Sequence, residues 1–71
     1  MLSRTKENKY GKYTWKIETE NLFHIFIHET NLSTYVVECK EWKWLSYTTH
    51  FIFVSNGDFH STIIEAFNKT L

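Results

Sequence analysis

Residues 47–67 read YTTHFIFVSNGDFHSTIIEAF and decide the fold, because they predict a strand, a tight turn and a helix in succession. The strand is expected over residues 46–55, where aromatic and β-branched residues dominate. Regular alternation predicts one face formed by Tyr47, Thr49, Phe51 and Phe53 and an opposite face formed by His50, Ile52 and Val54. Since both faces are partly apolar, we expect a strand that is covered on both sides.

A helix is predicted over residues 59–70, after the turn residues Asn56-Gly57-Asp58. Asp58 suits the N-cap position, where its carboxylate can accept a hydrogen bond from a backbone amide of the first turn. The apolar residues Phe59, Ile63, Ala66 and Phe67 recur at helical spacing. Such a helix is ~18 Å long, which is enough to cover one face of a small sheet.

Further strands are predicted upstream of this unit. Residues 12–19 alternate, and residues 22–29 carry apolar side chains on both faces. Residues 30–46 fit either a helix or a strand, and their β-branched residues favour a strand over residues 33–40 followed by a bend. The fold class predicted is α+β, a small antiparallel sheet of three to four strands with the C-terminal helix packed on one face.

The 71 residues are expected to form one domain at residues 10–71, preceded by a flexible basic arm at residues 1–9. Residues 1–16 hold five basic residues and one acidic residue, whereas residues 17–71 hold three basic and seven acidic residues. A basic segment is therefore joined to an acidic body, although the net charge of the chain is zero.

Cysteine usage and hydropathy indicate a cytoplasmic protein. Cys39 is the only cysteine, so no intrachain disulfide can form. Residues 1–16 are polar and do not resemble a signal peptide. No apolar run approaches the ~20 residues that a membrane-spanning helix requires.

No catalytic, cofactor or metal signature is evident. His24 and His28 lie on a predicted strand, where residues four apart are separated by ~13 Å and cannot share one ion. Asp58, His60 and Ser61 are of the types found in a hydrolase triad, but they fit the start of a helix better. We therefore expect a non-enzymatic protein without a metal or a cofactor.

The predicted sheet has more apolar surface than one helix can cover. Three covers are open for the second face: residues 31–45 folded over it as a helix, a sheet that curls on itself, or another chain, most simply a second copy in a homodimer. The segment Trp42-Lys43-Trp44, with Lys40 nearby, offers two aromatic anchors of the kind found in protein interfaces. These four residues are the predicted partner-binding site.

The leading hypothesis is a small protein-binding regulator or inhibitor that acts through an aromatic sheet surface. An antiparallel sheet followed by a C-terminal helix also occurs in small phage inhibitors and in DNA-binding arms of integrases, an analogy of architecture that says little about function. A chain of this size without catalytic apparatus fits a regulator or inhibitor of viral or mobile-element origin. The alternative is nucleic-acid binding through the basic segment, and its candidate residues are Arg4, Lys6, Lys9, Tyr10, Lys12 and Lys16.

Overall fold

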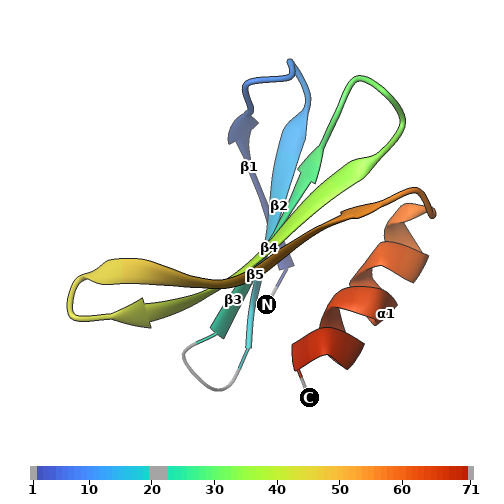
Figure 1. Cartoon of the computed structure of the whole chain (residues 1–71). Coiled ribbons are helices and arrows are strands. Elements are labelled where there is room, and N and C mark those ends of the chain that lie inside the picture. Colours follow the sequence, from blue (N-terminus) through green and yellow to red (C-terminus); the bar gives the residue numbers. More distant parts are fainter. Residues whose placement is uncertain (1, 20–22, 71) are drawn as a thin grey trace.

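The computed structural model describes residues 2–19 and 23–70. Within these residues, five strands form one antiparallel sheet in sequence order, and one helix follows them (Figure 1). The elements are β1 (Leu2–Glu7), β2 (Tyr13–Glu18), β3 (Phe23–Glu29), β4 (Tyr35–Lys43), β5 (Ser46–Ser55) and α1 (Phe59–Thr70). The predicted α+β class, with an antiparallel sheet and a C-terminal helix, is confirmed.

The predicted number of strands is wrong, because the sheet has five strands in the described residues rather than three or four. The additional strand is β1, which lies in the stretch expected to be a flexible arm. Its sequence lacks apolar alternation, and it joins the sheet by backbone pairing, with Arg4 opposite Trp15. The Arg4 guanidinium also lies 4.3 Å from the centre of the Tyr13 ring, a cation–π contact that favours this position. Expectations for residues 1, 20–22 and 71 fall outside the described residues.

The ambiguous segment 30–46 is a strand rather than a helix, since β4 spans Tyr35–Lys43. It therefore cannot cover the second face of the sheet. In the described part of the chain, no helix is long and apolar enough to cross a membrane.

Helix α1 is fixed at its start by side-chain hydrogen bonds. The backbone amide of Ser61 donates to Asp58 Oδ1 at 2.7 Å, so the predicted N-cap is confirmed. This hydrogen bond lowers the pKa of the Asp58 carboxyl, because it favours the charged form. One turn later, the buried Thr62 hydroxyl is 2.7 Å from Ser55 Oγ and ties α1 to the end of β5.

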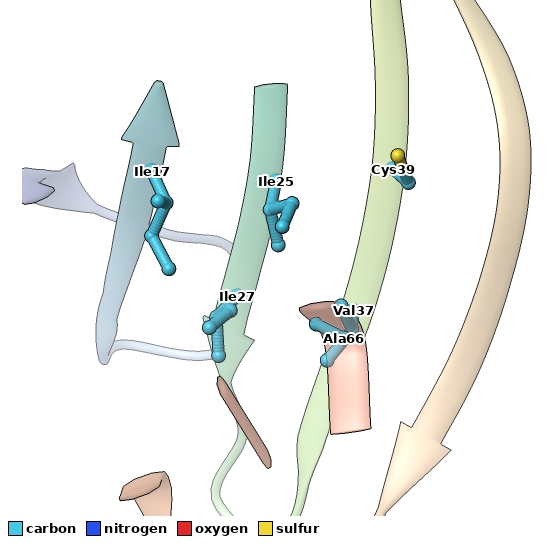
Figure 2. Close-up of a cluster of buried hydrophobic side chains, with 6 residues drawn as sticks. All are labelled: Ile17, Ile25, Ile27, Val37, Cys39 and Ala66. Carbon is cyan, nitrogen blue, oxygen red and sulfur yellow. The ribbon is translucent and has the colours of Figure 1, made fainter. Parts of the chain in front are cut away.

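The core lies between α1 and one face of the sheet. It consists of Ile17, Ile25, Ile27, Val37, Cys39 and Ala66, whose exposed fractions are 8% or less (Figure 2). Strands β2, β3 and β4 supply the first five of these side chains, and α1 supplies Ala66. Burial raises the pKa of the Cys39 thiol, as expected for a small core residue rather than a reactive one.

A β-bulge in β5 overturns the alternation predicted for residues 46–55. Cys39 pairs with Phe51 and Lys40 pairs with Thr49, so His50 is an extra residue without a partner in β4. His50 and Phe51 consequently both lie on the side of the helix. Beyond the bulge the pattern is reversed, and Ile52 and Val54 share the face that Thr49 occupies.

Candidate protein-binding surface

The face of the sheet opposite α1 is the candidate binding surface, and we call it the open face. No described helix or strand packs across it. Alternation with the core residues assigns the following side chains to it. They are Thr14, Lys16, Glu18, His24, Phe26, His28, Val36, Glu38, Lys40, Trp42, Tyr47, Thr49, Ile52 and Val54.

Rings that contact one another form the centre of the open face. Phe26 meets the Tyr47 ring edge-on at a centroid distance of 5.6 Å, and Tyr47 meets Trp42 at 4.9 Å. His24 lies beside both Phe26 and Tyr47, and its Nδ1 is 2.9 Å from the Tyr47 hydroxyl. Strands β3, β4 and β5 each contribute to this cluster, so it is a property of the sheet rather than of one segment.

A hydrogen-bonded chain of polar groups runs beside the rings. The Thr14 hydroxyl is 2.8 Å from His28 Nδ1, and His28 Nε2 is 2.7 Å from Glu38 Oε1. The Lys40 ammonium lies 3.5 Å from the other Glu38 oxygen and 5.5 Å from the centre of the Phe26 ring. A hydroxyl, an imidazole and a carboxylate in series are the groups of a nucleophilic triad. Since Thr14 is only 7% exposed, we interpret the series as a link between β2, β3 and β4.

The two ends of the open face differ. At one end, the loop between β1 and β2 borders a hollow of about 350 Å³ whose lining includes Tyr10, His28 and Glu38. Towards the outer strand, Ile52 and Val54 are 58% and 60% exposed. Together with the ring cluster they extend the exposed apolar area of this face, and large contiguous apolar areas are typical of interaction sites.

The turn between β4 and β5 extends the apolar surface. It consists of Trp44 and Leu45, which we call the hairpin tip, and these residues are 89% and 88% exposed. Their φ values are 55° and 66°. Two positive φ values in a two-residue hairpin turn normally require glycine or asparagine. The tip therefore holds two bulky, exposed side chains on a strained backbone. It is the turn that joins β4 to β5 in Figure 1.

The structure separates the four predicted partner-binding residues. Trp42 and Lys40 lie together on the open face, where Trp42 contacts Tyr47. Lys43 is exposed on the opposite side of β4, and Trp44 belongs to the turn. The two tryptophans are thus not a pair on one strand, because β4 ends at Lys43.

Phe26, Tyr47, Ile52 and Val54 were not singled out from the sequence as site residues. A signal was available, because the strands predicted at residues 22–29 and 46–55 carry apolar residues on both faces. The grouping of Tyr47 with Ile52 was hidden by the bulge at His50.

The residues proposed for nucleic-acid binding are distributed over different parts of the sheet. Arg4 lies beside Tyr13 and Trp15 on the helix side, whereas Lys16 is on the open face. The Lys16 ammonium is 3.2 Å from Glu18, and this contact raises the pKa of Lys16. The Lys9 ammonium is 5.3 Å from the Tyr10 ring centre, and Lys12 is exposed in the same loop. The side chain of Lys6 lies outside the described part of the structure.

The histidines and Cys39 do not converge. His24 is on the open face, whereas His50 and Cys39 lie on the helix side, where His50 Nε2 is 2.9 Å from Glu41 Oε1. Among the described residues there is no group of three or more histidine, cysteine or acidic side chains suited to hold a metal ion.

Comparison of the chain with protein-family models, curated proteins and solved structures gives no match.

Proposed function

We propose that this chain is a small non-enzymatic protein-binding domain, acting as a regulator or inhibitor, and that a protein partner packs on its open face and hairpin tip. The observation that carries the proposal is the unequal cover of the sheet. Helix α1 covers one face, while the other face presents a ring cluster and two exposed aliphatic residues that no described helix or strand covers.

The chemistry of the open face suits a protein partner. Aromatic residues are enriched in the cores of protein interfaces, and truncation of tryptophan or tyrosine there often costs 2 kcal/mol or more. The polar groups of this face already hydrogen-bond to one another, as in the pair His28–Glu38. A partner can therefore bury the rings without leaving those polar groups unsatisfied.

The hairpin tip is the proposed anchor. Trp44 and Leu45 bury almost none of their apolar area within the chain, so their insertion into an apolar pocket of a partner would remove that area from water. Their strained backbone is consistent with a binding role, because strain of this kind persists mainly at functional sites.

The test is capture of partners from a lysate by the tagged chain, with and without nuclease, followed by affinity measurement on the identified partner. We expect Trp44→Ala to weaken binding about tenfold or more while the domain stays folded, because the side chain has few contacts within the chain. Leu32→Ala is the matched control, since Leu32 is also highly exposed but lies in the turn between β3 and β4. Equal affinities for both variants, or no protein captured after nuclease treatment, would refute the proposal.

Nucleic-acid binding through the β1–β2 hairpin is the second candidate. Lys9 and Lys12 lie in its loop and are exposed, which leaves two cations free to approach phosphates. This candidate predicts binding that weakens steeply with salt and that is lost in the double variant Lys9→Ala/Lys12→Ala. Binding that is insensitive to salt would exclude it.

A further inference from the structure

The two outer strands of the sheet differ in how well their unpaired edges are protected against pairing with another strand. Among the described strands, β1 and β5 each pair on one side only. Strand β1 is six residues long, contains Arg4, Lys6 and Glu7, and has an irregular register. Strand β5 is ten residues long and contains no lysine, arginine, aspartate, glutamate, proline or glycine.

An unpaired edge is a template for pairing with another strand, and monomeric proteins usually protect it. Charged side chains, prolines, short strands and bulges are the common protections. Strand β1 has three of these features, whereas β5 has only the bulge at His50. The backbone groups along the outer side of β5 are therefore available for a further strand.

We propose that β5 pairs antiparallel with β5 of a second copy of this chain, along its full length, and joins the two sheets into one. In this register Ser46 lies opposite the partner's Ser55. The inference goes beyond the protein-binding function and does not depend on it, because it concerns the edge of the sheet.

The bulge makes this register possible. In a regular strand of ten residues, the first and last residues face opposite sides, yet residues directly opposite each other in an antiparallel pair share a face. If two regular copies paired along their full length, each side chain would be opposite a residue that points to the other face of the sheet, which an antiparallel pair does not allow. In β5, Tyr47 and Thr49 lie on the open face before the bulge, and Ile52 and Val54 lie on it afterwards. The extra residue, His50, reverses the alternation in the middle of the strand, so residues opposite each other in the full-length pair share a face.

The register also produces favourable pairs. Tyr47 is placed opposite the partner's Val54, and Thr49 is placed opposite the partner's Ile52. Aromatic side chains opposite β-branched ones are among the stabilising cross-strand pairs. Ile52 and Val54, which are exposed in one copy, thereby gain apolar neighbours.

A second copy fits this edge better than a chain of different composition. Because β5 has no lysine, arginine, aspartate or glutamate, self-pairing brings no permanently charged side chains of like sign together. The net charge of the whole chain is zero, so long-range repulsion does not oppose association. A domain of this size also gains from association, because its own core is small. The two helices would lie on the same side of the joined sheet, and the two open faces would be continuous.

Sedimentation equilibrium of the purified full chain tests the association. We expect the wild type to reach twice the mass of one chain. Ile52→Lys should raise the dimer dissociation constant about tenfold or more, because a lysine on an edge strand is a natural barrier to pairing. Leu2→Lys adds the same charge to the other edge and should leave the constant nearly unchanged. A monomeric wild type, or equal effects of the two variants, would overturn the inference.

Disulfide formation tests the register. A mixture of Thr49→Cys and Ile52→Cys chains should form a mixed disulfide dimer in oxidised glutathione, since these positions are opposite each other. Each variant alone should not, because two copies of one position are offset by the length of two residues of β4, or ~7 Å along the strand, and with the strand separation added this exceeds the reach of a disulfide. Cys39 can remain in both, since it is 1% exposed. A mixed dimer of Ile52→Cys with Val54→Cys chains instead would contradict the full-length register.

The two assays keep this inference separate from the proposed function, because neither contains a partner protein. A dimer that captures no other protein would remove the proposed function alone. A monomer that captures a partner would remove this inference alone.

Discussion

The two faces of the sheet carry apolar side chains that are buried to different degrees. The face under α1 has the fully buried residues Ile25, Ile27 and Val37 at its centre, and aromatic side chains such as Phe51 and Phe53 pack around them. The open face has aromatic rings and histidines at its centre, and these contact one another along the surface. The buried residues under α1 require the helix to exclude water, whereas the rings of the open face contact one another and hydrogen-bond through their polar groups without a cover.

This difference explains how a sheet with two apolar faces remains folded beneath a single helix. Polar groups between the rings, such as His28 and Glu38, are hydrogen-bonded across strands and limit the area of continuous apolar surface. The covered face supplies the stability of the domain. The open face keeps aromatic area accessible and is the better place for a partner.

The largest effect is expected from a truncation of the covered face. Ile27→Ala should lower the free energy of unfolding by about 3 kcal/mol, because Ile27 is fully buried and the lost atoms leave a cavity. Ile52→Ala makes the same chemical change on the open face and should change it by less than about 1 kcal/mol at low protein concentration. Urea unfolding followed by circular dichroism measures both. Equal losses would show that the open face is also covered.

An intermediate effect is expected at the hairpin tip. Replacing Trp44 with Asn and Leu45 with Gly should stabilise the domain by about 1–2 kcal/mol, because both new residues accept positive φ with little strain. The same double variant should lose affinity for the partner. Thermal unfolding measures the stability, and a binding assay measures the affinity. A stabilised variant that keeps full affinity would show that the hairpin tip is not needed for binding the partner.

A smaller effect is expected from the charge that caps α1, the cover of the first face. The pKa of Asp58 is lowered in the folded state, so its charge stabilises the fold above the unfolded pKa of about 3.9. That stabilisation is lost as the pH falls through the lower folded pKa. Asp58→Asn should therefore be less stable than the wild type at pH 7 and equally stable at pH 2. If Asp58→Asn remained less stable than the wild type at pH 2, the loss would come from the geometry of the capping hydrogen bond rather than from the charge of Asp58.

Much of the fold and part of the candidate site follow from local patterns. Period-two alternation indicated strands at residues 12–19 and 46–55, apolar and β-branched residues favoured strands at residues 22–29 and 33–40, and helical spacing after Asp58 identified α1. The excess of apolar strand surface over one helix pointed to an open face, and Trp42 and Lys40 are part of it. Phe26 and Tyr47 were not chosen, because the ring cluster forms between strands that are distant in sequence.

Local sequence therefore determined the α+β class, the start of the helix and the surplus of apolar surface, because these depend on side-chain periodicity and on hydrogen bonds between near neighbours. Only the tertiary structure decided the place of β1, the bulge at His50 and the turn at Trp44. Strand β1 is held by backbone pairing with β2, which leaves no apolar pattern to read. The bulge and the turn are set by the register of β4 against β5, and a shift of one residue there exchanges the two faces of a strand.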